Sequence, residues 1–291
     1  MTEAHKGHLA MLAFSALVAG SFSLGALAAP HVSPNALTVA RFALAGALVG
    51  AAALASTGVA RSAFAAPWRY LVLGGLLAAY FVLMFEGLRT ARAVPMAAVF
   101  TLTPVMAAGF GWLLLGQITT ARMACALAIG AVGALWVIFR GDPAALARAE
   151  IGRGEVIYFI GCIAHALYAP MVRKLNRGEP AVVFTFGMMV AGFALLAVWG
   201  WRDVWETDWL ALPGIVWICL IYVAVAASAM TFVLLQFATL RLPAAKVMAY
   251  TYLVPAWVIL WEMARGQPVP LIVLGGVVLT VVALGLLVRE A

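Results

Sequence analysis

Three ionisable side chains fall inside apolar stretches of this sequence, and each could bind a charged or polar partner. Arg41 and Lys246 could attract a carboxylate, or they could extend toward the lipid headgroups. His165 stands in the middle of its stretch, where it could relay protons near neutral pH or bond a neighbouring helix. An ionisable group near a bilayer centre costs roughly 2.5–3.5 kcal/mol or more, so all three are candidate site residues.

Neutral hydrogen-bonding side chains lie in the same stretches. They could simply join helices, at about 0.6 kcal/mol per bond. Gathered around one pocket with aromatic and sulfur-containing neighbours, they would suit a small amphipathic solute with a neutral side chain. The candidate cavity residues are Ser21, Phe22, Arg41, Tyr80, Phe100, Thr101, His165, Tyr168, Gln236, Lys246, Met248 and Tyr252.

Two prolines stand in the middle of apolar stretches. Pro104 and Pro255 would each remove one backbone hydrogen bond, which kinks a helix and frees a carbonyl group. Such kinks could shape a cavity, or they could serve helix packing alone. We expect a helix kink at each proline.

Several kinds of chemistry lack their motifs here. The sequence contains no HExxH, GxSxG or GxxxxGK[ST] pattern. Cys125, Cys162 and Cys219 fall in apolar stretches without a CxxC pair, so neither a disulfide framework nor a metal site is expected. Glu86 and Glu262 lie near the ends of apolar stretches and no acidic residue lies near a centre, which disfavours proton-driven cation antiport. We expect a protein that is not an enzyme and needs no cofactor.

The composition places the chain in a lipid bilayer. It has 291 residues, of which 66% are hydrophobic and 10% charged, whereas soluble domains have about 45–50% apolar and about 25% charged residues. The net charge of +7 is scattered through short connections, as membrane insertion requires, so nucleic-acid binding is not expected.

Ten stretches are long enough to cross the bilayer as helices, which needs about 20 mostly apolar residues. They cover residues 8–28, 36–56, 69–88, 93–115, 121–139, 154–173, 181–200, 212–239, 243–264 and 268–288. With both termini in the cytoplasm, ten Lys and Arg residues would be cytoplasmic and seven would lie opposite, which favours this orientation.

The second half of the chain is a diverged copy of the first. Residues 81–104 align with residues 232–255 at one offset of 151, both blocks begin FVL, and both end at one of the two prolines. Each half has five spans, so the second copy must enter the membrane from the other side. We expect an all-α polytopic membrane protein with two inverted five-helix repeats, residues 1–142 and 143–291. Secondary transporters are built this way, with a solvent-accessible cavity at the midplane between the copies.

Longer motifs resemble one family. The first span opens KGHLAMLAFSALVAGSFSLG, the second reads PNALTVARFALAGAL with its early Arg, and PVMAAGFGWLLLGQ follows the fourth-span proline. Together with the ten spans in two copies, these residues resemble the EamA family of the drug/metabolite transporter superfamily. The chain departs from the family's habit at Ala19-Gly20, where members often have Trp-Gly, and at Gly116-Gln117, where they often have Gly-Glu.

The resemblance implies a fold, a location and a function. Spans 1 to 4 and 6 to 9 would surround a central cavity, and spans 5 and 10 (121–139 and 268–288) would lie to one side, where their small residues favour close packing or a homodimer face. The protein would sit in a bacterial inner membrane and would be most similar to amino-acid exporters of the YddG type. Arg41 or Lys246, tyrosine hydroxyls and kink-freed carbonyls would hold a zwitterion.

The leading hypothesis is an exporter of small neutral or aromatic amino acids, or related metabolites, that works by alternating access. One alternative is an exchanger of anionic or phosphorylated metabolites, with Arg41 and Lys246 as an anion clamp. Another is a broad-specificity drug or metabolite exporter. A membrane receptor or scaffold is a third, although the sequence has no soluble signalling module.

Overall fold

A computed structural model describes residues 2–142, 144–145 and 151–288, and helices are the only regular secondary structure in these residues. The elements of the first half are α1 (Glu3–Ala28), α2 (Pro34–Ser56), η1 (Arg61–Phe64), α3 (Trp68–Leu88), α4 (Ala93–Phe100), α5 (Thr103–Leu115) and α6 (Ala121–Ile138). Those of the second half are α8 (Arg153–Leu175), α9 (Ala181–Trp199), α10 (Trp201–Glu206), α11 (Gly214–Ala224), η2 (Val225–Met230), α12 (Thr231–Thr239), α13 (Ala244–Ala249), η3 (Tyr250–Leu253), α14 (Val254–Ala264) and α15 (Ile272–Val288).

The ten predicted spans are confirmed. Within the described residues, nine apolar helices reach the length needed to cross a membrane, and the shorter apolar helix α15 is the tenth. α15 begins at Ile272, four residues later than predicted, because Pro268 and Pro270 precede it and proline does not continue a helical hydrogen-bond pattern. The short helix α10 was not predicted. The expected junction beside residue 143 lies outside the described residues.

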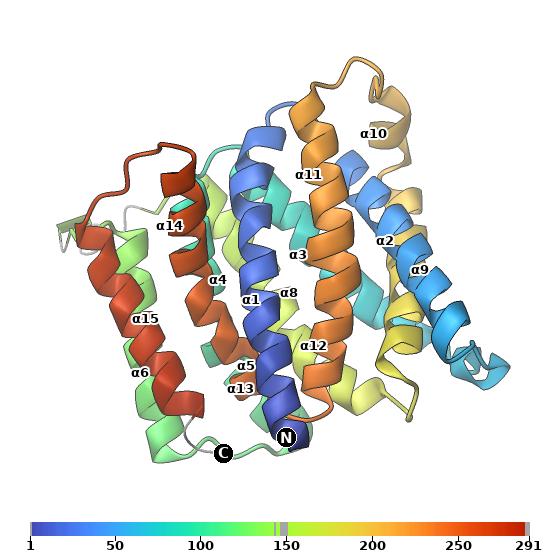
Figure 1. The fold of residues 1–291 in the computed structure, drawn as a ribbon, viewed down its shortest axis with the longest axis horizontal. Coiled ribbons are helices and arrows are strands. Elements are labelled where there is room, and N and C mark those ends of the chain that lie inside the picture. The colour runs from blue at the N-terminus through green and yellow to red at the C-terminus, as the bar shows by residue number, and fades with distance from the viewer. Residues whose placement is uncertain (1, 143, 146–150, 289–291) are drawn as a thin grey trace.

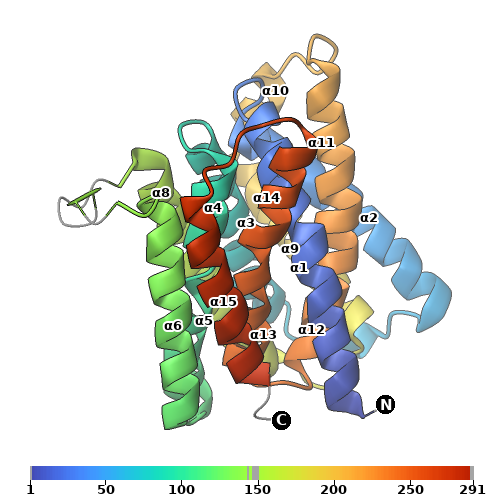
Figure 2. The ribbon, with the colours of Figure 1, turned by 60° about the vertical axis from the view of Figure 1, so that its left-hand side comes forward.

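The two repeats run in opposite directions. α1 begins and α15 ends at the same end of the bundle, which we call the terminal face, whereas α8 begins at the other end, the opposite face (Figure 1). Helix pairing follows the same symmetry, because α3 packs on α8 as α11 and α12 pack on α1, and α2 packs on α9. α6 and α15 pack on each other at one side of the bundle (Figures 1 and 2).

Small residues explain the close packing of α6 and α15. A Cβ atom added to Gly276 would lie 2.6 Å from the carbonyl oxygen of Gly133, and one added to Gly133 would lie 2.7 Å from that of Gly276. Neither carbonyl can move without bending its helix. Glycine at these two positions therefore lets the backbones touch, as it does in other membrane helix pairs.

Replacing Gly276 by Ala should lower the free energy of unfolding by roughly 1–3 kcal/mol, because the added methyl overpacks the α6–α15 contact. The matched control is Gly285→Ala on the same helix, where an added Cβ would meet no atom within 4 Å. That variant should be neutral or more stable by up to about 1 kcal/mol. Thermal unfolding in detergent checks both, and equal effects of the two substitutions would refute the packing argument.

Polar bridges join the repeats at both faces. At the terminal face, Arg69 Nη2 donates to Glu179 Oε1 at 2.7 Å, and the two side chains are only 1% and 9% exposed. Arg69 Nη1 also donates to the carbonyl oxygen of Leu175. At the opposite face, Asn35 Nδ2 donates to Asp203 Oδ2 at 2.6 Å. Each bridge connects the N-terminal half to the C-terminal half.

Candidate functional site

A small cavity lies between the two repeats, in the middle of the bundle. Its walls come from α1, α2, α3 and α4 of the first repeat and from α8, η2 and α12 of the second. The lining residues are Phe14, Val18, Ser21, Arg41, Tyr80, Phe81, Met84, Phe100, His165, Ala227, Thr231 and Phe232. Their side chains leave about 10 Å³ of free volume, which is roughly the space that one water molecule needs.

The cavity is closed to both faces, which corrects the expectation of a solvent-accessible chamber at this depth. Arg41 and Phe100 are fully buried, and Tyr80 and His165 are at most 2% exposed. Aromatic rings fill the space that a solute would occupy, because Phe81 and Phe232 stand 5.6 Å apart across it. The structure therefore holds the closed conformation of this site, and a solute larger than water can enter only if helices move.

Arg41 carries its charge into this cavity without a carboxylate partner among the described residues. Its Nε donates to Ser228 Oγ at 2.5 Å and its Nη2 to the carbonyl oxygen of Ala227 at 2.6 Å. The guanidinium lies 3.5 Å from the centre of the Phe81 ring, a cation–π contact. Nη1 has no hydrogen-bond partner. A buried cation held only by neutral groups is costly, and an anionic ligand would remove that cost.

The π-helix η2 supplies both polar partners of Arg41. A π turn widens the helix from i→i+4 to i→i+5 bonding and is often found at functional sites. Here it spans residues 225–230 and turns Ala227 and Ser228 toward α2, so that a carbonyl and a hydroxyl oxygen accept from the guanidinium. Ser228 Oγ itself donates to the carbonyl oxygen of Val223.

Other buried polar atoms around the cavity also lack partners. Ser21 Oγ, His165 Nδ1 and Thr231 Oγ1 are buried and make no hydrogen bond in the structure. Buried polar groups are nearly always bonded, so each such atom needs an explanation. Four of them, counting Arg41 Nη1, line one small cavity, which points to a polar ligand that would satisfy them together.

The family follows from comparison with known proteins. The sequence matches the model of the EamA-like transporter family over residues 5–139 and again over residues 152–289. The chain belongs to the EamA-like transporter family. It is 24% identical over 280 residues to the uncharacterized transporter YyaM of Bacillus subtilis (strain 168), covering 94% of this chain and 90% of that protein. A crystal structure with 23% sequence identity has the same fold, with a TM-score of 0.71 over 99% of this chain and 98% of the other.

Membership in this family confirms that the chain is a membrane transporter with the predicted fold. An EamA-like chain is a transporter, and this one is a multi-pass membrane protein whose described residues include ten apolar helices. The resemblance to the family that the motifs indicated is therefore correct. The transported solute depends on the chemistry of the cavity.

Five of the twelve candidate residues line the central cavity of this EamA-like protein. They are Ser21, Arg41, Tyr80, Phe100 and His165, contributed by α1, α2, α3, α4 and α8. The ring of Tyr80 lies 4.4 Å from that of His165, and its hydroxyl shares a 2.9 Å hydrogen bond with Tyr158.

Three more candidates lie next to the cavity rather than in its wall. Phe22 packs on Phe100 with ring centres 6.0 Å apart. The Tyr168 hydroxyl donates to the sulfur of Met188 and accepts from Gln236 Nε2, which links α8, α9 and α12.

The remaining four candidates lie away from the cavity wall. Thr101 donates to the carbonyl oxygen of Ala98 in its own helix. Tyr252 points to α6, where its hydroxyl donates to the carbonyl oxygen of Leu127. Met248 is buried in the apolar core. Lys246, in α13, is near His8 and so belongs to the terminal face, which separates it from Arg41.

Lys246 and Arg41 therefore do not form the anion clamp of the alternative hypothesis in this conformation. His8 Nδ1 lies 3.0 Å from the Tyr250 hydroxyl, near the start of α1. No group of three His, Cys, Asp or Glu side chains that could hold a metal occurs within the described residues.

The two predicted proline kinks coincide with breaks in two helices that cross each other. α4 ends at Phe100, and Pro104 stands at the start of α5. The second break passes through the 3-10 turn η3, and Pro255 stands at the start of α14. The hydroxyls of Thr103 and Thr251 lie 3.2 Å apart and join the two breaks.

An aromatic layer separates the cavity from the opposite face. Phe22, Phe100 and Tyr158 form it, with ring centres 5.9 to 6.4 Å apart. Tyr158 lies near the start of α8, and α8 begins at the opposite face, so the layer covers that side of the cavity. Cys162 lies one turn below Tyr158 on α8 and is fully buried.

Removing one ring of this layer should open it. We expect Phe22→Ala to raise the rate at which a small thiol reagent modifies Cys162 by about tenfold or more, because local opening controls access to buried groups. Mass spectrometry distinguishes this thiol from Cys125 and Cys219. Phe193→Ala, which truncates a side chain 38% exposed on the outside of α9, is the control. Unchanged reactivity in Phe22→Ala would mean that the layer is not the barrier.

Proposed function

We propose that this EamA-like protein exports small neutral or aromatic amino acids across a bacterial inner membrane, with both termini in the cytoplasm. One observation carries the proposal. Arg41, fully buried between the two repeats, has no acidic partner among the described residues and directs an unpartnered N–H group at a cavity. A substrate carboxylate would supply the missing anion.

The other unpartnered atoms fit the rest of a zwitterion. An imidazole with its proton on Nε2 would let His165 accept a hydrogen bond at Nδ1. The hydroxyl oxygens of Ser21 and Thr231 can accept as well, so these atoms would hold an ammonium group. The rings of Phe81 and Phe232 would contact an apolar or aromatic side chain. No second Lys or Arg among the described residues lines the cavity beside Arg41, which favours one carboxylate over a phosphate dianion.

The closed cavity fits a transporter that alternates between two open states. A free amino acid needs far more room than about 10 Å³, so binding requires the repeats to separate around the site. Phe81 and Phe232 occupy equivalent positions in the two repeats and meet at the middle of the bundle. Rocking one repeat against the other would part these two rings and open a space next to Arg41.

Transport by purified protein in liposomes tests the proposal. We expect protein-dependent flux of labelled Phe, Met or Thr, and no protein-dependent flux of phenethylamine, which keeps the ring and the amine of Phe but lacks the carboxylate. Liposomes without protein give the background. No flux of any amino acid would refute the substrate class, and equal flux of phenethylamine would refute the role of the carboxylate.

A further inference from the structure

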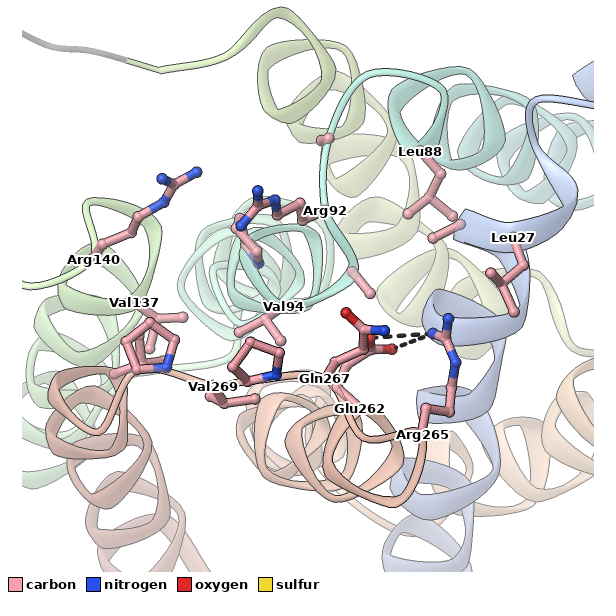
Figure 3. A pocket seen from close by; sticks show the side chains of 17 residues that line it. Leu27, Leu88, Arg92, Val94, Val137, Arg140, Glu262, Arg265, Gln267 and Val269 are labelled. Atoms are coloured by element: carbon pink, nitrogen blue, oxygen red, sulfur yellow. Dashed lines mark hydrogen bonds and ion pairs between the residues drawn. The ribbon is translucent and has the colours of Figure 1, made fainter.

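A second and larger cavity opens at the opposite face. It has a volume of about 590 Å³ and lies between the ends of α4, α6, α14 and α15, with the end of α1 at its side (Figure 3). Its walls are largely apolar, formed by residues such as Leu27, Leu88 and Val94. We call it the outer vestibule.

The outer vestibule carries a surplus of positive charge. Arg265 Nη1 pairs with Glu262 at 2.9 Å, whereas Arg92 and Arg140 make no ion pair among the described residues. Figure 3 shows Arg92 and Arg140 away from the Glu262–Arg265 pair, so these two charges are not neutralised by Glu262. Arginines on the side to which loops are translocated run against the usual distribution in membrane proteins, and a functional role would account for them.

The backbone holds one of these arginines in an unusual conformation. Arg140 has a φ of 55°, in the left-handed region that few non-glycine residues adopt. It lies two residues past the end of α6, at the rim of the outer vestibule. Left-handed residues are common just past helix ends, and here the N–H of Gly141 donates to the carbonyl oxygen of Trp136, which closes α6 and fixes the backbone from which the Arg140 side chain leaves.

The outer vestibule lies close to the central cavity, on the side that the aromatic layer covers. On α1, Ser21 lines the cavity and Ala26 lines the vestibule, a separation of about 7.5 Å along the helix. On α4, Phe100 lines the cavity and Val94 lines the vestibule, about 9 Å apart along the helix. A solute that leaves the central cavity past this layer would enter the outer vestibule directly.

We propose that the outer vestibule is a second, weaker binding site for the same amino acids, occupied as they leave. The carboxylate would bind Arg92 and Arg140, and the side chain would contact the apolar wall. This inference rests on the proposed function, since it assumes that the exported solute is a zwitterion with an apolar side chain.

Binding of labelled Phe to the protein in phosphatidylcholine nanodiscs tests the inference. We expect two sites per protein. The double variant Arg92→Gln/Arg140→Gln should keep the tight site and weaken the second at least tenfold, whereas Arg41→Gln should lose the tight site only. Arg153→Gln/Arg202→Gln, which removes two exposed arginines of the opposite face outside the vestibule, should bind as the wild type does.

The possible outcomes separate this inference from the proposed function. A single site that Arg41→Gln removes, and that the double variant leaves unchanged, would overturn the second site alone. No binding in any variant would overturn the proposed function as well. The same measurement in phosphatidylglycerol nanodiscs tests for competition by an anionic lipid. If the second site is present in phosphatidylcholine but absent in phosphatidylglycerol, the vestibule binds a lipid headgroup and the inference is overturned.

Discussion

Replacing Arg41 by Met should strongly reduce amino-acid transport while leaving the protein folded. Loss of a charge-assisted contact to a buried carboxylate typically costs about 2–5 kcal/mol, which is a decrease of about 30-fold to several thousand-fold in kcat/KM. Stability should change far less, by under about 2 kcal/mol, because a buried cation without an acidic partner does little to stabilise the fold. Liposome flux and thermal unfolding measure the two effects.

Two further variants separate charge from packing. Arg41→Lys keeps the charge but cannot donate in the planar arrangement of a guanidinium, so it should recover only part of the flux. Arg61→Met changes an exposed arginine in η1 and should transport as the wild type does. If Arg41→Met transports normally, the carboxylate does not bind there. If it unfolds, Arg41 serves the structure and not the substrate.

Replacing Glu179 by Gln should cause the largest loss of stability in the protein. The substitution leaves Arg69 buried without its counterion, and breaking a buried pair in this way costs roughly 3–5 kcal/mol. The control is Glu86→Gln, whose partner Arg89 is 52% exposed, so that the change there should be under about 1 kcal/mol. Similar unfolding midpoints for the two variants would contradict the structural role of the Arg69 pair.

The same ion pair predicts a pH dependence. Burial acts to raise the pKa of Glu179, but hydrogen bonds from Arg69 and from the backbone N–H of Arg177 outweigh it, and the pKa lies below its ordinary value. A carboxyl group with a lowered folded-state pKa contributes stability above its unfolded-state pKa, and this contribution is lost as pH falls through the folded-state value. Acid should therefore lower the unfolding midpoint of the wild type more than that of Glu179→Gln.

The architecture was predictable because membrane spans depend on composition and length. Runs of about 20 apolar residues locate the helices, and residues 81–104 and 232–255 carry enough similarity to reveal the duplication. The ends of helices were less predictable. α1 begins at Glu3, five residues early, because Thr2 caps the helix and Glu3 pairs with Lys6 and Arg241 outside the apolar stretch.

The site was partly predictable for a different reason. Arg41 and His165 were found because polar groups inside apolar stretches are rare and need a partner. Tyr252 could not be placed, because the 3-10 turn η3 rotates its side chain toward α6. Ser228 is the hydrogen-bond partner of Arg41 Nε, but it was not predicted. Its position depends on the π-helix η2, and a π-helix has no clear sequence signal.

The most informative signal at the site was the repeat itself. Phe81 and Phe232 are the first residues of the two FVL blocks, and they meet at the centre of the cavity. In a protein with inverted repeats, equivalent residues near the symmetry axis face each other, so they are candidates for the midplane site. A search for polar residues inside the apolar stretches does not find these two phenylalanines, because both are apolar.

A density map of the protein determined with saturating Phe tests the central claim most directly. We predict a bound amino acid between the repeats, with a carboxylate oxygen within hydrogen-bonding distance of Arg41 Nη1 and the rings of Phe81 and Phe232 moved apart. An unoccupied central cavity that keeps its closed packing, with the amino acid bound elsewhere or absent, would contradict the account.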